Sequence, residues 1–521
     1  MRTNRFLLPL IVAVALGAAS PCFVTAQDAA MSDLFKNMPQ GDGSTDGAAA
    51  GGEPSSGQVG AATVSPAAWS FSGEQTSTYR LPILRDPLDY SGVHLKPDVE
   101  NLLRIKGKLG STRFLSSWRV DLWPLGTPLS SAPGEVLSSG PSDITLTPED
   151  NYVLAGSESL YLQVGYFIDS WGVADGINPT NNVNPVDYTH GLAPESIPSL
   201  LLKAVYYPVR ALSLEAVFEP YKRGDLFPVD PVSAIPSSLF QTSDITILQL
   251  PLDLSTAVYG FKATLYTSAV DLSLTYLYDI DAYYTPEITY VTIADKSLAL
   301  ERTRIHQIGA DAKSSLGPFG LWLEACLSLT TDPSGTSYNV RNPSISWTAG
   351  TDVSFGPSGT FYLNLQYTGR YILGFDKSFF IDYPDGGPNL TLMMTDPAYA
   401  IEYYARALSQ PLGDQTEGLL SGIILKCDFP LLNGTWKPSV NAAYYLPALY
   451  DTTLETRYGS LLLQPSLTFK PADSTEITLG AQLMYAWKKD VGASTVTIDT
   501  ADRIGMWNNQ SNLYVQVGVK W

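Results

Sequence analysis

Hydrophobic and polar residues alternate with a period of two along most of the chain from about residue 70 to residue 521. In the segment that begins at Ser159, Leu160, Leu162 and Val164 alternate with Tyr161 and Gln163. This period is typical of a β-strand with two different faces. The alternating segments are about ten residues long, which is enough for a tilted strand to cross a bilayer. The sequence therefore predicts an all-β protein whose strands can span a membrane.

The connections between the predicted strands alternate between short and long. Short periplasmic turns and long outer loops are typical of outer-membrane barrels. We therefore predict a transmembrane antiparallel up-and-down β-barrel of about 18 strands. An even number places both ends of the barrel on the same side of the membrane. The strands are expected near 74–84, 99–109, 112–123, 143–155, 159–168, 199–208, 211–221, 255–266, 269–281, 301–314, 319–330, 343–355, 358–371, 418–430, 434–446, 457–470, 474–487 and 510–521.

The last predicted strand places apolar residues at alternate positions and ends in an aromatic residue. It resembles the C-terminal signal that the barrel-assembly machinery recognises in Gram-negative-type bacteria. Its physical role is also clear without that resemblance, because the closing strand needs an apolar outer face and an interfacial aromatic. The alternative is an ordinary closing strand of a soluble sheet. The residues that carry this prediction are Leu513, Val515, Val517, Val519 and Trp521.

The first 26 residues have the features of an export signal. Arg2 and Arg5 precede an apolar stretch over 6–19, and Ala26 ends a small-residue pattern that a signal peptidase would cut. A membrane anchor is the alternative, but the apolar run is short for a helical span. We expect a signal peptide over 1–26, a flexible periplasmic segment over 27–70, and the barrel over 71–521. The predicted location is the cell outer membrane, with its lipid and the barrel-assembly machinery as partners.

Composition narrows the function. The chain has 521 residues, of which 16% are charged, and a formal net charge of −19. A typical charged share is roughly 25%, and a barrel whose outer face meets lipid needs less. The negative net charge disfavours nucleic-acid binding. The segment over 27–70 is too short and too poor in apolar residues to form a plug domain.

Polar positions on the predicted strands would face the lumen if the apolar positions face lipid. Four basic residues flank one short turn, so they would form a positive wall low in the barrel. These lumen charges either bias which solute passes or pair with one another and solvate the wall. The same lumen-facing position is expected for Glu219, Asp271, Lys437, Glu476 and Lys520. The main pore-lining candidates are Arg104, Lys106, Lys108, Arg113, Arg119, Asp121, Lys203, Glu215, Lys262, Glu324, Asp352 and Arg370.

The loop after the fifth predicted strand is rich in turn-forming residues. The pattern that runs from Gly165 to Trp171-Gly172 and then to Asn184-Pro185-x-Asp187 resembles a poorly characterised family of outer-membrane barrels. That family is similar to alginate-export and solute-specific porins. The family's usual polar residue after the first glycine is Tyr166 here. The resemblance implies a folded-in loop that narrows the pore, with Trp171, Gly172, Asn184, Pro185 and Asp187 as constriction candidates. The alternative is an outer loop that its own turns hold rigid.

A second long loop, over about 372–417, contains a predicted helix. Asp396 is a good N-cap, Pro397 suits the first helical position, and Gly413 follows the last turn. Such a helix would constrict the pore, dock on the rim or contact a partner, and the sequence leaves these alternatives open.

No catalytic motif accompanies the barrel pattern. The three histidines, His94, His190 and His306, stand outside any nucleophile or zinc motif, and Cys326 and Cys427 are far apart. We therefore expect no enzyme activity, no metal and no cofactor.

The predicted function is a porin-like channel for small polar or charged solutes. Two alternatives are a surface scaffold whose loops bind a partner and a gated transporter of hydrophobic or polymeric cargo. The oligomeric state is left open.

Overall fold

The computed structural model describes most of the predicted barrel and parts of its loops. The predicted signal peptide, residues 27–67, His94 and His190 lie outside the described residues. The described residues are 68–83, 99–122, 144–157, 159–188, 195–227, 231–232, 235–251, 253–356, 361–375, 389–413, 418–447, 456–490, 495, 497–498 and 504–521.

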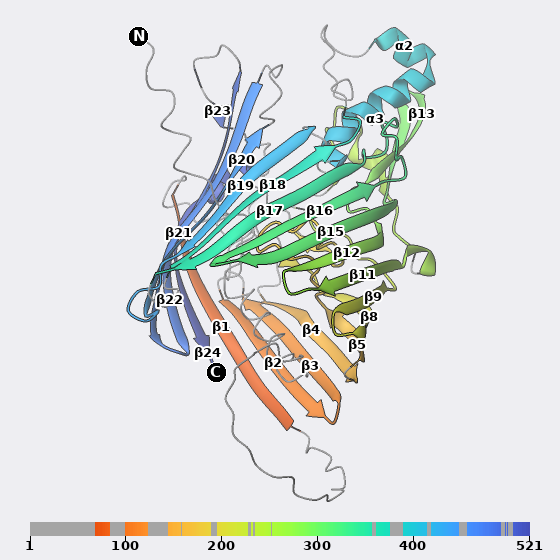
Figure 1. Cartoon of the computed structure of the whole chain (residues 1–521). Helices are drawn as coiled ribbons and strands as arrows, with labels where there is room; N and C mark the ends of the chain where they lie inside the picture. Colours follow the sequence, from red (N-terminus) through yellow and green to blue (C-terminus); the bar gives the residue numbers. More distant parts are fainter. Residues whose placement is uncertain are drawn as a thin grey trace, which may run out of the picture.

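Eighteen antiparallel strands form one closed barrel, which confirms the predicted fold class (Figure 1). Each strand pairs with its sequence neighbours in the barrel, and the first strand pairs with the last. The sheet also includes β23 (Thr497–Ile498), which pairs only with β22. The barrel strands are β1 (Ala68–Pro82), β2 (Val99–Leu109), β3 (Thr112–Leu122), β4 (Ile144–Gly156), β5 (Leu160–Phe167), β8 (Ser199–Val209), β9 (Leu212–Glu219), β11 (Val258–Tyr266), β12 (Val270–Ile280), β15 (Arg304–Leu316), β16 (Phe319–Leu329), β17 (Ser344–Phe355), β18 (Phe361–Ile372), β19 (Leu419–Asp428), β20 (Trp436–Pro447), β21 (Thr456–Ala472), β22 (Thr475–Asp490) and β24 (Asn512–Lys520).

Every predicted strand range overlaps one strand of the barrel, and most ends agree within a few residues. The clearest difference is β1, which begins at Ala68 and not at 74 because Ala68 already pairs with Lys108 of β2. Short strands inside the long loops were not predicted. Among the described residues these are β6 (Val186–Asp187), β7 (Glu195–Ser196), β10 (Ile245–Ile247), β13 (Thr285–Thr292), β14 (Asp295–Glu301) and β23.

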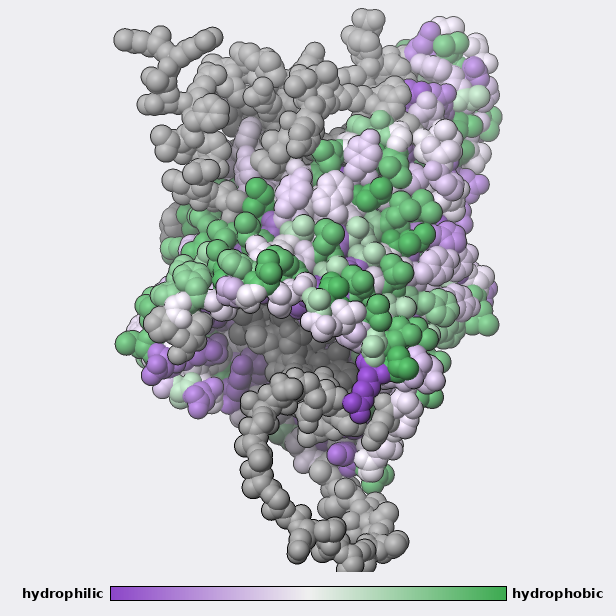
Figure 2. Space-filling model, viewed as in Figure 1, coloured by the Kyte–Doolittle hydropathy of each residue, from purple (hydrophilic) through white to green (hydrophobic). Residues whose placement is uncertain are grey.

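The outer face of the barrel is apolar. On β5, Leu160, Leu162 and Val164 are exposed, whereas Tyr161 and Gln163 between them are buried inside the barrel. Figure 2 shows hydrophobic side chains gathered over the strands of the visible face. Exposed apolar side chains in this number are costly in water and favourable in lipid, so this face suits a bilayer.

The two ends of the barrel differ. One end carries tight turns, such as the one at Gly110, whose φ of 60° suits glycine. The chain enters β1 and leaves β24 at this same end, where Glu74 lies opposite Lys520 (Figure 1). In outer-membrane barrels the short turns lie at the periplasmic end. The long loops, α2 (Leu390–Thr395) and α3 (Pro397–Gly413) lie at the other end.

A small folded unit, which we call the rim unit, lies at the outer end. It contains α2, α3 and the three-stranded sheet of β10, β14 and β13. Leu298, Leu300 and Leu408 form part of its buried core. The predicted helix matches α3, and backbone N–H groups of Ala398 and Tyr399 donate to the Asp396 carboxylate that caps it. None of the described helices is both long and apolar enough to cross a membrane.

Candidate functional site

The loop over 168–188, which we call the crossing loop, lies inside the barrel. It leaves β5, and the Trp171 side chain is only 1% exposed. The indole Nε1 of Trp171 donates to Glu215 Oε1 on β9 at 2.6 Å. The indole also lies over Gly260 of β11, where an added Cβ would be 2.7 Å from the ring. The start of the loop is therefore held against the wall formed by β9 and β11.

The middle of the crossing loop is held by a more distant part of the wall. The backbone N–H groups of Val173 and Ala174 both donate to Glu324 on β16, which has no exposed surface. The Thr180 hydroxyl donates to the other oxygen of Glu324 at 3.2 Å. Further along the wall, Asn364 Nδ2 on β18 donates to Asp175 Oδ2 at 2.9 Å. The loop thus reaches from β5 to β18 along the inside of the barrel.

Turns within the loop fix its path. Asn184 accepts from the backbone N–H of Asp169 at 2.7 Å and donates to the carbonyl of Phe167 at 3.0 Å. Gly172 has a φ of +88°, and an added Cβ there would be 2.3 Å from Asn178 Oδ1. Pro185 and Asp187 lie at the end of the loop, where Asp187 pairs with Glu195 in the hairpin of β6 and β7. The loop is therefore both organised by its own turns and placed in the lumen.

The pore-lining candidates all lie on the inner face of their strands, because they alternate with outward-facing apolar residues. Lys108 lies opposite Arg113 across β2 and β3, with Arg104 and Lys106 on the same wall. Lys262 lies opposite Glu215, and Asp352 opposite Asn364. That these side chains line a conducting pore stays a prediction. The structure does not bring all of them together, since they follow the wall from β2 to β18.

Several of these charges are paired beside the crossing loop. Lys203 Nζ is 2.5 Å from Asp169 Oδ1 and 3.1 Å from Glu215 Oε2, and all three side chains are largely buried. Arg119 forms ion pairs with Asp121, Glu149 and Glu195 at 3.2 Å each.

Asp169, Glu149 and Glu195 were missing from the sequence-based candidates. Asp169 lies in the crossing loop, and Glu195 lies in β7, whereas the candidates were taken from the alternation of barrel strands. Glu149 escaped because a bulge between β3 and β4 shifts the alternation there.

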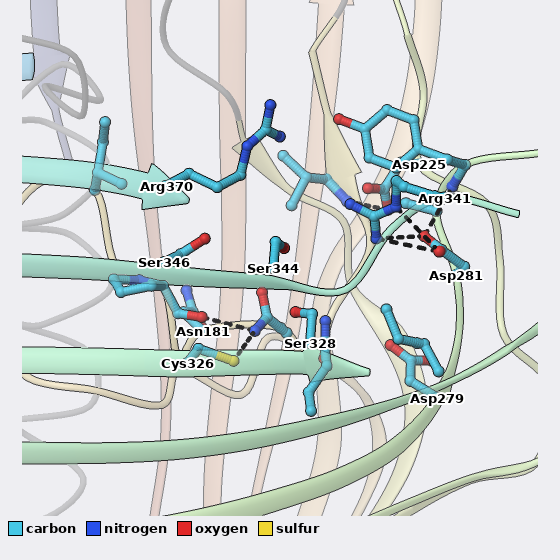
Figure 3. Close-up of a pocket in the computed structure, with 18 of the residues that line it drawn as sticks. Asn181, Asp225, Asp279, Asp281, Cys326, Ser328, Arg341, Ser344, Ser346 and Arg370 are labelled. Atoms are coloured by element: carbon cyan, nitrogen blue, oxygen red, sulfur yellow. Dashed lines mark hydrogen bonds and ion pairs between the residues drawn. The ribbon is translucent and has the colours of Figure 1, made fainter. Parts of the chain in front are cut away.

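A cavity of about 300 Å³ lies on the outer side of the crossing loop (Figure 3). Ile177, Asn181 and Asn182 of the loop form part of its lining. Its other walls come from β12, β15, β16, β17, β18, β19 and β20 and from the outer loops after β9, after β12 and before β17. We call it the vestibule cavity.

Ion pairs form one side of the vestibule cavity. Arg341 Nη2 is 2.9 Å from Asp281 Oδ1, and Lys222 Nζ is 3.1 Å from Asp279 Oδ2. Burial alone would lower the pKa of Lys222, but Asp279 and Glu219 outweigh it and raise that pKa. Burial raises the pKa of Asp225, which accepts the backbone N–H of Val186 at 3.0 Å.

The remaining chemistry-bearing residues do not form a centre. Within the ranges that the structure describes, no group of three His, Cys, Asp or Glu side chains is arranged to hold a metal. His306 lies on the outward face of β15, where its Nδ1 is 2.9 Å from the Tyr276 hydroxyl. Cys326 and Cys427 are free thiols.

Comparisons with known proteins gave structural matches only. No protein family and no curated protein matches the chain. Wzi, an outer-membrane protein involved in group 1 capsule assembly in Escherichia coli and a carbohydrate-binding β-barrel, is 9% identical, with 87% of this chain and 84% of that chain covered and a TM-score of 0.42. OccAB1 of Acinetobacter baumannii is 9% identical, with 88% and 97% covered and a TM-score of 0.45. OccK9 (OpdG) of Pseudomonas aeruginosa is 10% identical, with 87% and 98% covered and a TM-score of 0.45.

Proposed function

We propose that this chain is an outer-membrane channel through which small polar or charged solutes diffuse, and that the crossing loop narrows its lumen. The observation that carries the proposal is the contrast between an apolar outer wall and a charged inner wall with a loop bonded across it. Barrels of 16 to 18 strands leave an aqueous channel. A loop held inside such a barrel reduces the free cross-section and brings solutes against its side chains.

The basic wall near the short turns supports a preference for anions. Beside the crossing loop the cations are paired and the carboxylates outnumber them, because Lys203 faces two carboxylates and Arg119 faces three. The wall of Arg104, Lys106, Lys108 and Arg113 near the short turns is predominantly basic, because these four residues share the inner faces of β2 and β3. A lumen lined by one sign of charge concentrates the opposite ion even when the whole protein has the other sign.

Single-channel recording of the refolded mature protein in a planar bilayer tests the proposal. We expect stable conductance steps and a reversal potential in a potassium chloride gradient that reports a chloride preference. The double variant Lys106→Ser with Lys108→Ser should weaken that preference. Lys296→Ser is the matched control, because Lys296 lies over the Tyr404 ring in the rim unit and outside the lumen. A folded barrel that shows no steps would refute the channel.

The rim unit favours a second candidate function, a surface scaffold that binds a partner. Its core packs two helices on a sheet, so it is a folded unit and not a simple connection. If the folded barrel does not conduct, this candidate becomes the better one. The expected partners in the envelope are outer-membrane lipid and the barrel-assembly machinery.

A further inference from the structure

We propose that the vestibule cavity binds an uncharged, polyhydroxylated solute such as a sugar or a polyol. The inference rests on the proposed channel function and names the class of solute that the channel would select. It depends on three properties of the cavity: its charge balance, its hydroxyl and amide groups, and its size.

The charges of the lining are balanced. Its described residues include three cationic and three anionic side chains, which are Lys222, Arg341, Arg370, Asp225, Asp279 and Asp281. Two cations are ion-paired with two of these carboxylates, in the pairs Arg341 with Asp281 and Lys222 with Asp279. A solute with a net charge would have to compete with these pairs and lose its own hydration. An uncharged solute avoids that cost.

The strands that line the cavity also present hydroxyl and amide groups, beside Arg370, which lies directly across from Ser346. Ser328 on β16 lies directly across from Ser344 on β17, and Ser346 lies next to Cys326 in the same register. Ser328 and Ser346 are partly exposed to the cavity, as are Asn181 and Asn182 of the crossing loop. Figure 3 shows these serines, Asn181 and Arg370 around the same space.

A mixture of donors and acceptors of this kind matches a solute hydroxyl. Each hydroxyl both donates and accepts, so it can bond to serine, to an amide or to a paired ion without disturbing the pair. A carboxylate solute only accepts and an ammonium solute only donates, so each would satisfy only part of this wall. Tyr283 adds an aromatic ring to the lining, and the Arg341 guanidinium lies over it at 4.6 Å from the ring centre.

The size of the cavity agrees with one small solute. Its volume of about 300 Å³ is at the lower end of the range of roughly 300–1,000 Å³ that is usual for small-molecule sites. The crossing loop lines one side of it, so a bound solute would lie directly above the narrowed part of the lumen.

The test compares three probes on single channels of the full barrel. Sucrose is the uncharged polyhydroxylated probe, polyethylene glycol of equal hydrodynamic size is the size control, and potassium glucuronate is the charged control. We expect sucrose to interrupt the ion current at concentrations at which the glycol does not. Equal interruption by sucrose and glycol, or stronger interruption by glucuronate, would overturn the inference.

The double variant Ser328→Ala with Ser346→Ala removes two hydroxyls without adding bulk. Each lost hydrogen bond weakens binding by roughly two- to ten-fold, so we expect the sucrose affinity to fall by roughly tenfold. Ser466→Ala is the matched control, because Ser466 is a partly exposed serine on the inner wall outside the cavity lining. Unchanged sucrose affinity in the double variant would also overturn the inference.

Calorimetric titration of the detergent-solubilised barrel with sucrose separates this inference from the proposed function. Conductance without sucrose binding would leave the channel in place and refute the sugar site. Sucrose binding that the double variant weakens, in a barrel that does not conduct, would refute the channel and support the site.

Discussion

Glu324 is the residue on which the position of the crossing loop most depends. One of its oxygens accepts the backbone N–H groups of both Val173 and Ala174, and the other accepts the Thr180 hydroxyl at 3.2 Å. Replacing Glu324 with alanine removes these acceptors and leaves the half-buried N–H groups of Val173 and Ala174 without them. The loop should then detach from the wall of β16 more often.

The magnitude follows from these bonds. Hydrogen bonds to a charged group each contribute about 1.5–3 kcal/mol, and the burial of the carboxylate offsets part of that gain. Trp171 and Asn184 still hold the ends of the loop. We therefore expect the attached state to lose about 3 kcal/mol, which raises the detached fraction roughly a hundredfold.

Single-channel recording measures this change. Glu324→Ala should show more frequent visits to a state of higher conductance. Glu324→Gln should change less, because its amide oxygen still accepts both N–H groups, whereas its NH2 group no longer accepts the Thr180 hydroxyl. Asp311 lies directly opposite Glu324 on β15 and bonds to Ser273, so Asp311→Ala opens a similar space without touching the loop. If Glu324→Ala conducts like Asp311→Ala and the unchanged protein, the crossing loop is not anchored as the structure indicates.

Four further changes test other contacts. Trp171→Ala should lower the free energy of unfolding by about 3–5 kcal/mol because it empties a buried site, and thermal unfolding in detergent would measure the loss. Lys203→Met should lower the free energy of unfolding by about 3–5 kcal/mol, because it leaves the Asp169 carboxylate buried without its cation. Adding Asp169→Asn should recover much of that loss in the same thermal unfolding assay. Burial would raise the pKa of Asp332, but bonds from the Ser334 hydroxyl and from the N–H groups of Ser337 and Thr336 lower it. The stabilisation of its loop is therefore present above its ordinary pKa and is lost as the pH falls through the lowered value. The protection factor of the Ser337 amide against hydrogen exchange should fall only in acid, and a fall of equal size near neutral pH would contradict this. Trp521→Ala should slow assembly of the barrel in cells, and assembly at the normal rate would count against the role of the last strand as a signal.

The local pattern of the sequence was enough to predict the barrel wall. Successive side chains of a strand point to opposite faces, so the alternation at Leu160, Tyr161 and Leu162 assigns the outer and inner positions without knowledge of any neighbour. The lengths of the connections then indicate the two ends of the barrel. For the same reason Glu215 and Glu324 were recognised as inner-face residues.

The contacts inside the barrel were decided only by the tertiary structure. The alternation that places Glu324 on the inner face does not show that Val173 and Ala174 bond to it, because those residues are about 150 positions away in the chain. The sequence left two interpretations of the crossing loop open: a loop folded into the pore and a rigid outer loop. These two interpretations differ only in such contacts. Arg341 and Asp281 lie at the outer ends of strands, where no periodicity applies, so their pairing and the vestibule cavity beside it had no local signal. Strand faces follow from the geometry of each strand, whereas loop positions and ion pairs follow from which distant strands the closed barrel brings together.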